Sequence, residues 1–319
     1  MRVAVIGAGG IGGLYGGLLA RAGHDVSFLA RGAHLRAIQA NGLEIRSAEF
    51  GTFKVPGVAS DDPTDLGQAE LVLFAVKTYD LDQAALAARE VLGQHSSLLT
   101  FQNGLDAPDQ VAVVVGKEHV LIGTTALETT ILEPGVIGHL SKFHFITVSA
   151  FDGPPTPTVD HIAQTLRSAG ATVDVTPDGR RTLWEKAWAL IPMATITAVC
   201  RAPIGEMRNL PETRALIEAL LDEVSAVALA CGYDLPEARE RAHAMLIEIA
   251  PPGMKASMAR DFERGGRTEL EALTGALVRL ADAQGVNVPA TRTAYAILKL
   301  RQKVEAGAEN RVGIAAGGR

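Results

Sequence analysis

A glycine-rich turn near the start of the chain has the spacing of a phosphate-binding loop. Gly7, Gly9 and Gly12 follow the pattern G-x-G-x-x-G, after an apolar run at residues 3–6 and before a helical stretch at 11–22. Gly7 permits a tight turn, Gly9 lets the backbone approach a pyrophosphate, and Gly12 lets the helix pack closely on the strand. Free N–H groups at the start of the helix would bind the phosphates. This context favours a dinucleotide-binding loop over a glycine-rich turn without a ligand.

The second expected strand, at residues 25–29, leads to Arg31, with His34 nearby. Proteins that bind NAD usually place Asp or Glu here, where the carboxylate binds the ribose 2′-hydroxyl. A guanidinium suits a 2′-phosphate instead, so Arg31 predicts NADP(H) as the cofactor. The alternative is that Arg31 is a solvated surface residue.

Two further polar residues follow apolar strands. Lys77 comes directly after the run at residues 70–76, and Asn103 follows the run at 97–101. Ligands bind at the carboxyl ends of the strands in open α/β sheets. Taken alone, Lys77 could be a charge leaving a buried strand, and Asn103-Gly104 could be a turn. Their occurrence at two successive strand ends favours a binding site for both.

The order of the expected elements predicts two domains. Residues 1–177 alternate strands with helices, which is typical of an α/β Rossmann domain with a parallel sheet and helices on both faces. Residues 43–58 and 136–149 are expected to add peripheral strands. Pro177-Asp178-Gly179 marks the boundary, and residues 178–319 are expected to form an all-helical C-terminal domain. Its helices are expected at 181–199, 211–231, 235–249, 268–283 and 289–306.

Composition excludes several classes of protein. The 30 Lys and Arg residues against 36 Asp and Glu give a net charge of −6 without a basic arm, which argues against nucleic-acid binding. Cys200 and Cys231 provide neither a disulfide framework nor a zinc site, and no metal site is expected. No stretch approaches about 20 uninterrupted apolar residues, so we expect no membrane span. A cytoplasmic protein is the expectation.

At this point the sequence resembles the ketopantoate reductases, also called 2-dehydropantoate 2-reductases. The resemblance covers nearly the whole chain, and its most specific part is the stretch from Ser257 to Glu271, which nothing about folding requires. Its pieces are the glycine loop, Arg31, Ala75-Val76-Lys77, Gln102-Asn103-Gly104, Gly123-Thr124-Thr125, Pro134-Gly135-x-x-x-His139, Trp184-Glu185-Lys186, Ser257-Met258-x-x-Asp261 and Gly266-Arg267-Thr268-Glu269-x-Glu271.

The resemblance implies an enzyme that reduces 2-dehydropantoate to pantoate with NADPH, on the route to pantothenate and coenzyme A. By it, Lys186 matches the catalytic lysine, and Asn103 matches an asparagine near the nicotinamide and the substrate. Lys77 matches a lysine of the cofactor region. Ser257 and Glu269 match substrate-binding residues, and Glu269 also supports catalysis. A homodimer is compatible with the helical second domain.

The residues around Lys186 and Glu269 give further reasons to assign these two residues to the site. The residues three and four positions from Lys186 are Thr182, Leu183, Ala189 and Leu190. None of them is acidic, so Lys186 cannot form an ordinary surface ion pair with a carboxylate one helical turn away. A proton donor needs a pKa lowered toward working pH, by burial or a neighbouring charge.

Thr268 and Glu271 fit a T-x-x-E capping box, which predicts Thr268 as N-cap and Glu269 as the first helical residue. Stabilisation by the helix dipole is the alternative explanation for Glu269.

The sequence departs from the family in one place. The family shows Lys-x-x-x-Asn-x-x-x-Asn, whereas here Leu190 and Ala194 follow Lys186 at the fourth and eighth positions. Pro192 lies inside the same expected helix, where it removes a backbone donor. Thr195 or Thr197 could replace the amides if the helix kinks. Three functions are therefore weighed: a ketopantoate reductase, a 2-hydroxy acid dehydrogenase with a more apolar substrate, and a non-catalytic NADP-binding sensor.

Overall fold

A computed structural model describes the backbone of residues 1–316 and the side chains as far as residue 305. The chain divides into two compact units, of which the first is Met1–Thr182 and the second begins at Leu183. The division falls in the first turn of helix α6 (Gly179–Cys200), just after the Pro177-Asp178-Gly179 segment. Each unit is described in turn. No described helix is both long enough and apolar enough to cross a membrane.

The first unit is built on an eight-stranded sheet in the order β12-β11-β8-β7-β6-β1-β2-β5. Its neighbouring strands are parallel except for β8 and β11. The expected parallel sheet is therefore correct apart from this pair. Parallel strands need a crossover connection, usually a helix, and the chain between β8 and β11 forms strands instead. The strands are β1 (Arg2–Ile6), β2 (Asp25–Leu29), β5 (Ala59–Ser60), β6 (Ala69–Phe74), β7 (Leu92–Thr100), β8 (Val120–Ala126), β11 (Phe145–Ala150) and β12 (Thr172–Val175).

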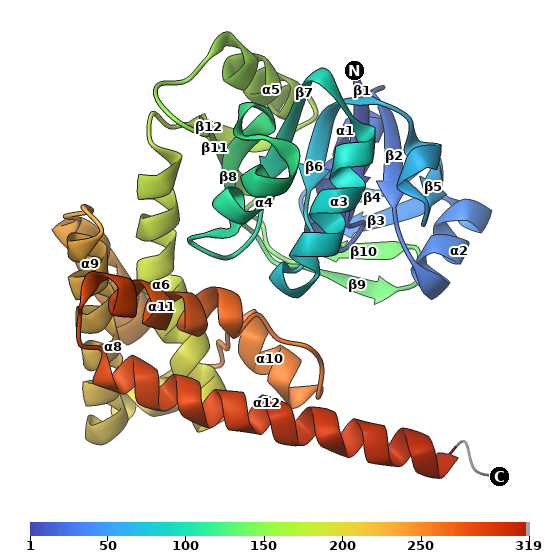
Figure 1. Ribbon diagram of the computed structural model, residues 1–319. Helices are drawn as coiled ribbons and strands as arrows, with labels where there is room; N and C mark the ends of the chain where they lie inside the picture. The colour runs from blue at the N-terminus through green and yellow to red at the C-terminus, as the bar shows by residue number, and fades with distance from the viewer. Residues whose placement is uncertain (317–319) are drawn as a thin grey trace. The chain divides into compact units, whose positions relative to one another are not determined.

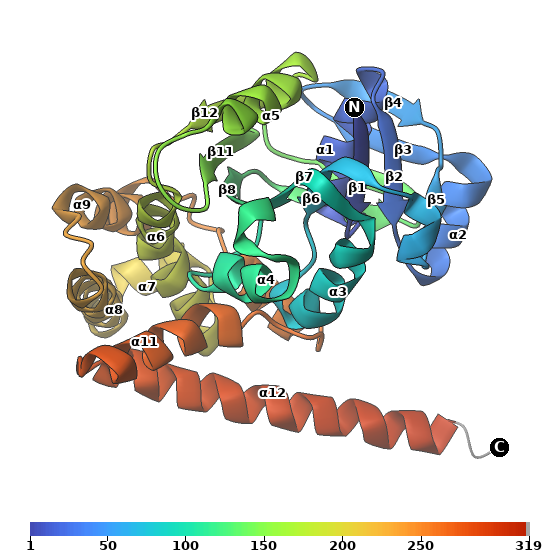
Figure 2. The same ribbon diagram turned by 45° about the horizontal axis from the view of Figure 1, so that its top comes forward.

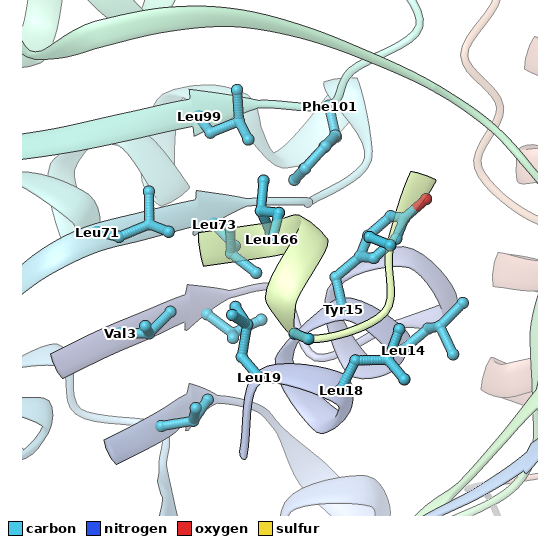
Figure 3. Packing of buried hydrophobic residues seen from close by; sticks show 14 of the residues in the cluster. Val3, Leu14, Tyr15, Leu18, Leu19, Leu71, Leu73, Leu99, Phe101 and Leu166 are labelled. Carbon is cyan, nitrogen blue, oxygen red and sulfur yellow. The ribbon is translucent and has the colours of Figure 1, made fainter. Parts of the chain in front are cut away.

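Helices cover both faces of this sheet because successive strand residues point to opposite sides. Val3 and Val5 of β1 belong to one buried cluster with residues of α1 and α5, and Figure 3 shows Leu14, Leu18 and Tyr15 of α1 packing there. Ala4 and Ile6 belong to the opposite cluster with residues of α3 and α4, which lie side by side in Figure 2. The helices are α1 (Gly10–Arg21), α2 (Gly32–Asn41), α3 (Leu81–Val91), α4 (Ala107–Val115) and α5 (Pro157–Ser168), with 3₁₀ turns η1 (Pro63–Leu66), η2 (Thr78–Asp80) and η3 (Lys117–His119).

A second sheet of four strands, in the order β4-β3-β10-β9, packs on the other side of α1. Its strands are β4 (Gly51–Val55), β3 (Leu43–Ser47), β10 (Val136–His139) and β9 (Thr129–Glu133). Two rows of glycine let α1 fit between the sheets. A Cβ at Gly13 would lie 2.7 Å from Ile137 Cγ1 of the small sheet, and a Cβ at Gly16 would lie 2.7 Å from Val5 Cγ2 of the large one. The segments expected to be peripheral thus supply β3, β4 and β10, while β11 joins the large sheet.

The second unit is helical (Figure 1). Its centre is α8, which packs against α7, α9, α11 and α12. Trp188 of α6 is 1% exposed, and its indole N–H donates to Ser225 Oγ of α8 at 2.8 Å. The remaining elements are α7 (Ile204–Asn209), α8 (Pro211–Ala230), α9 (Pro236–Ala244), the π-helical turn η4 (Met245–Ile249), α10 (Ser257–Glu263), the π-helical turn η5 (Glu271–Gly275), α11 (Ala276–Gln284) and α12 (Pro289–Ala316).

Candidate active site

The glycine loop between β1 and α1 has the geometry of a phosphate-binding turn. Gly7 has φ +101°, and a Cβ there would lie 2.9 Å from Val76 Cγ1, so only glycine fits. Gly9 is the N-cap of α1, and a Cβ built on it would meet nothing within 4 Å, so its backbone is open to a ligand. A Cβ at Gly12 would overlap the Gly7 carbonyl oxygen and lie 2.8 Å from Val5 Cγ1. The loop therefore presents the first N–H groups of α1 on an open surface.

The other candidate cofactor residues lie at the same edge of the large sheet. β7, β6, β1 and β2 are neighbours and parallel, so the residues that follow them share one edge. Arg31 is exposed at the N-cap of α2, while Lys77 and Asn103 are half-buried. The strand order changes direction between β1 and β6, and ligands of open α/β sheets bind at such a switch point.

Gln102 connects two of these strand ends, and its role could not be read from the sequence. Its side chain is 5% exposed, and its amide nitrogen donates to the Phe74 carbonyl at 2.9 Å and to the Val76 carbonyl at 3.1 Å. These bonds join the end of β7, just before Asn103, to the end of β6, just before Lys77. Gln102 therefore fixes the separation of the two segments that carry those residues.

His34 makes a similar connection on the other side of the glycine loop. The Gly135 N–H donates to His34 Nδ1 at 3.0 Å, so the ring proton lies on Nε2, which donates to the Ala8 carbonyl at 2.8 Å. Burial lowers the pKa of His34, which favours this neutral form. Ala8 lies inside the glycine loop and Gly135 in the turn between β9 and β10. The imidazole thus ties α2 to both.

In the second unit, Lys186 is a half-buried amine on α6. The indole rings of Trp184 and Trp188 on the same helix are buried, with their centroids 6.2 Å apart. Burial lowers the pKa of Lys186 from its usual 10.5 to about 8, and the Glu269 carboxylate opposes this by favouring the ammonium. This is the direction that a general acid near neutral pH needs.

Glu269 is 3% exposed and lies two residues before the π-helical turn η5. The expected capping box is wrong: Thr268 is not an N-cap, and its buried Oγ1 has no hydrogen-bond partner in the described structure. The Glu271 carboxylate accepts hydrogen bonds from Tyr295 Oη at 3.0 Å and from Lys299 Nζ, rather than from the backbone N–H of Thr268. The Glu269 carbonyl instead accepts from the Ala272 and Leu273 N–H groups.

Ser257 is the first residue of α10 and is half-buried. Ala256, before it, is the N-cap and provides no side-chain cap. A hydrogen bond of 2.5 Å from Lys255 Nζ, two residues before this helix, to Glu263 connects the preceding segment to the last residue of the helix. The described residues contain no cluster of His, Cys, Asp and Glu that could hold a metal ion.

Comparison with known proteins identifies the family. A family model described as "Ketopantoate reductase PanE/ApbA" matches residues 3–153, and its C-terminal counterpart matches residues 178–302. The 2-dehydropantoate 2-reductase of Halobacterium salinarum is 33% identical over 308 residues, covering 95% of this chain and 99% of the relative. The chain belongs to the ketopantoate reductase family.

Solved structures agree with this assignment to an oxidoreductase family. A ketopantoate reductase of Ralstonia eutropha superimposes with a TM-score of 0.89 at 32% identity, over 96% of this chain and 100% of the other. A D-mandelate dehydrogenase in complex with NADH and anilino(oxo)acetate shares the fold, with a TM-score of 0.86 at 18% identity over 96% of this chain. The predicted architecture, a Rossmann-type domain followed by a helical domain, is confirmed.

In α6 this member of the family lacks the two asparagines expected from the resemblance, at positions 190 and 194. Ala194 is fully buried, and Leu190 is half-buried. The hydroxyls of Thr195 and Thr197, considered above as replacements for the amides, are both used within the protein. Thr195 Oγ1 is 2.8 Å from Thr274 Oγ1, and Thr197 Oγ1 donates to the Met193 carbonyl at 2.6 Å. Both side chains are 0% exposed, so neither replaces an amide.

Proposed function

We propose that this protein reduces a 2-oxo acid to the 2-hydroxy acid with NADPH, and that 2-dehydropantoate is its substrate. The observation that carries this proposal is the half-buried Lys186, whose pKa is lowered to about 8 and which is under the influence of the buried Glu269 carboxylate. A lysine in this state can give up a proton near neutral pH. Membership of the ketopantoate reductase family supports the same reaction.

The residues of the first unit fit a dinucleotide. The open backbone at Gly9 and the first N–H groups of α1 would bind the pyrophosphate, and the exposed Arg31 would bind a 2′-phosphate. Lys77 and Asn103 follow β6 and β7, the strand at the switch point and its neighbour, where they would contact the nicotinamide end. When bound, NADPH supplies the hydride for the carbonyl carbon.

The residues of the second unit supply the remaining functions. The Lys186 ammonium donates a proton from Nζ to the substrate carbonyl oxygen as negative charge develops there. Ser257, with its hydroxyl at the start of α10, would hold the substrate carboxylate, and Asn103 would orient the carbonyl. Glu269 keeps Lys186 protonated, since its carboxylate raises the pKa that burial lowers. The products are the 2-hydroxy acid and NADP⁺, with one proton consumed.

A second candidate is a reductase for a more apolar 2-oxo acid. Leu190 and Ala194 replace two amides of the family pattern, and the hydroxyls of Thr195 and Thr197 are bonded within the protein. Without these donors, the part of the site that faces the substrate hydroxyl would be apolar, and apolar contacts discriminate by about 1–3 kcal/mol. An analogue of 2-dehydropantoate that lacks its hydroxyl would then be reduced about as efficiently.

One experiment tests these functions together. The protein is mixed with NADPH and a panel of 2-oxo acids, including 2-dehydropantoate and its analogue without the hydroxyl, and the nicotinamide absorbance is followed. A preference for 2-dehydropantoate of roughly 10⁴-fold or more supports the first candidate, because only a hydrogen-bonding site discriminates so strongly. Comparable rates support the second. Binding of NADPH without any turnover would overturn both and favour a cofactor-binding sensor.

A further inference from the structure

Two threonines of α6 connect this helix to two segments that carry candidate site residues. Thr195 and Thr274 are both 0% exposed, and their hydroxyl oxygens are 2.8 Å apart. Separating two hydroxyls buried in this way is costly, because each would stay out of water without a hydrogen-bond partner. The pair therefore holds its two segments at a fixed separation. Thr195 belongs to α6, the helix of Lys186, and Thr274 belongs to the π-helical turn η5.

Backbone hydrogen bonds in and before the turn η5 link Thr274 to Glu269. The Gly275 N–H donates to the Leu270 carbonyl at 2.9 Å, and the Leu273 N–H donates to the Glu269 carbonyl at 3.1 Å. These bonds hold the backbone from Glu269 to Thr274 in one fixed conformation. π-helical turns often occur at functional sites because the extra residue changes the direction in which side chains point. A displacement of Thr274 would therefore displace Glu269.

Thr197 makes the corresponding connection to α10. Its hydroxyl donates to the Met193 carbonyl at 2.6 Å, which leaves its oxygen free to accept from the Ala256 N–H at 3.4 Å. Ala256 is the N-cap of α10 and directly precedes Ser257. Side chains two positions apart in an α-helix point in directions that differ by about 200°. Thr195 and Thr197 therefore contact different segments.

We propose that Thr195 and Thr197 are positioning residues, which hold Glu269 and Ser257 in place relative to Lys186 on the same helix. This inference rests on the proposed function of the site. Thr195, through Thr274, sets the place of the carboxylate that acts on the catalytic amine. Thr197 sets the place of the hydroxyl that holds the substrate. Both threonines are 0% exposed, so we assign neither of them a contact with the reacting atoms.

The first test removes the Thr195–Thr274 hydrogen bond with isosteric variants. Thr195→Val and Thr274→Val should each lower kcat by about 10- to 100-fold, since misplacement by about 1 Å has effects of that size. The KM for NADPH should stay unchanged. The double variant should be no slower than either single variant, because both remove one interaction. Thr195→Ser, which keeps the hydroxyl, should restore most of the rate.

The control for this test is Thr291→Val. Thr291 is 0% exposed in the same unit, and its hydroxyl has no hydrogen-bond partner among the described residues, so its replacement removes no described hydrogen bond of that hydroxyl. It should leave kcat at the wild-type value. If Thr195→Val lowers only the melting temperature and keeps the wild-type kcat, the threonine pair is merely structural and the inference fails.

A second measurement reads the position of Glu269 without turnover. The rate at which an amine-reactive reagent modifies Lys186, followed by peptide mass spectrometry across pH, reports the pKa of that amine. Besides Glu269, the charged groups near this part of α6 include Glu185, which lies 4.0 Å from Arg241. Because Glu269 raises the pKa of Lys186, Thr195→Val and Thr274→Val should move the midpoint of modification to lower pH. An unchanged midpoint would contradict the inference, even if the wild-type protein reduces no 2-oxo acid and the proposed function fails.

The connection through Thr197 predicts a different kinetic change. Thr197→Val frees the Ala256 N–H, so Ser257 loses its fixed place while Glu269 keeps its own. The KM for the 2-oxo acid should rise by about tenfold, with a smaller change in kcat. If Thr197→Val and Thr195→Val change kcat and KM to the same extent, or if Thr197→Val leaves the KM for the 2-oxo acid unchanged, Thr197 does not position Ser257.

Discussion

The pH dependence of turnover should follow the protonation of Lys186. Lowering its pKa from 10.5 to about 8 makes the ammonium about 300-fold more acidic, while about nine-tenths of it stays protonated at pH 7. A general acid works best in this range, because it is both charged and able to release its proton. We expect kcat for 2-oxo acid reduction to be constant below about pH 8 and to fall about tenfold per pH unit above it.

Two variants locate the origin of this profile. Lys186→Ala should leave NADPH binding intact and lower turnover by about 10²- to 10⁴-fold, the usual effect of losing a positioned acid. Glu269→Gln should keep a measurable rate and move the descending limb to lower pH, because the carboxylate that favours the ammonium is gone. The assay is NADPH oxidation between pH 6 and 10 with saturating substrate. A descending limb near pH 10.5, or near-normal turnover of Lys186→Ala, would refute the reasoning.

The same pKa change has a consequence for stability. Between about pH 8 and 10.5 the unfolded chain keeps a proton on Lys186 that the folded chain has lost, so this group makes the free energy of unfolding rise with pH in that window. Its slope cannot exceed about 1.4 kcal/mol per pH unit. Urea unfolding of the wild type and Lys186→Met at pH 8 and 10 isolates this contribution, and an identical pH dependence in both would contradict it.

Three further predictions concern the cofactor and the substrate. Arg31→Ala should weaken NADPH binding by roughly ten- to a hundredfold and leave NADH binding nearly unchanged, and equal affinities in the wild type would contradict the role of Arg31. Leu190→Asn should raise the ratio of kcat/KM for 2-dehydropantoate over that for the analogue without its hydroxyl, whereas Ala194→Asn, at a fully buried position, should instead lower the melting temperature. His34→Leu should weaken NADPH binding by about tenfold, since the Ala8 carbonyl loses its donor, and His34→Gln should recover part of it.

The sequence predicted the fold and the edge of the sheet at which the candidate cofactor residues lie, because these follow from local patterns. Gly7, Arg31 and Lys77 each follow an apolar strand, and parallel pairing brings such residues to one edge. The antiparallel pairing of β8 with β11 could not be predicted, because it depends on what the intervening residues form.

The candidate site of the second unit was less predictable. The pattern T-x-x-E at Thr268 indicates a capping box, but Tyr295 and Lys299, more than 20 residues away, bind the Glu271 carboxylate instead. The bond between Thr195 and Thr274 spans 79 positions. Such contacts depend on tertiary packing, which overrides local preference.

The helix α1 has eight consecutive buried residues, Gly12 to Leu19, because a sheet covers each side of it. Most helices of α/β domains keep one face in water, where substitutions are tolerated and the helix can shift. Here every position from Gly12 to Leu19 is buried against a neighbour, which restricts displacement of the helix and of the amides at its start. The hairpins β3–β4 and β9–β10 look like dispensable insertions in the chain. A Cβ at Gly13 or Gly17 would meet Ile137 or Ile45 of these hairpins, so we expect deletion of either hairpin to expose part of the helix and to weaken the binding of a dinucleotide at its start.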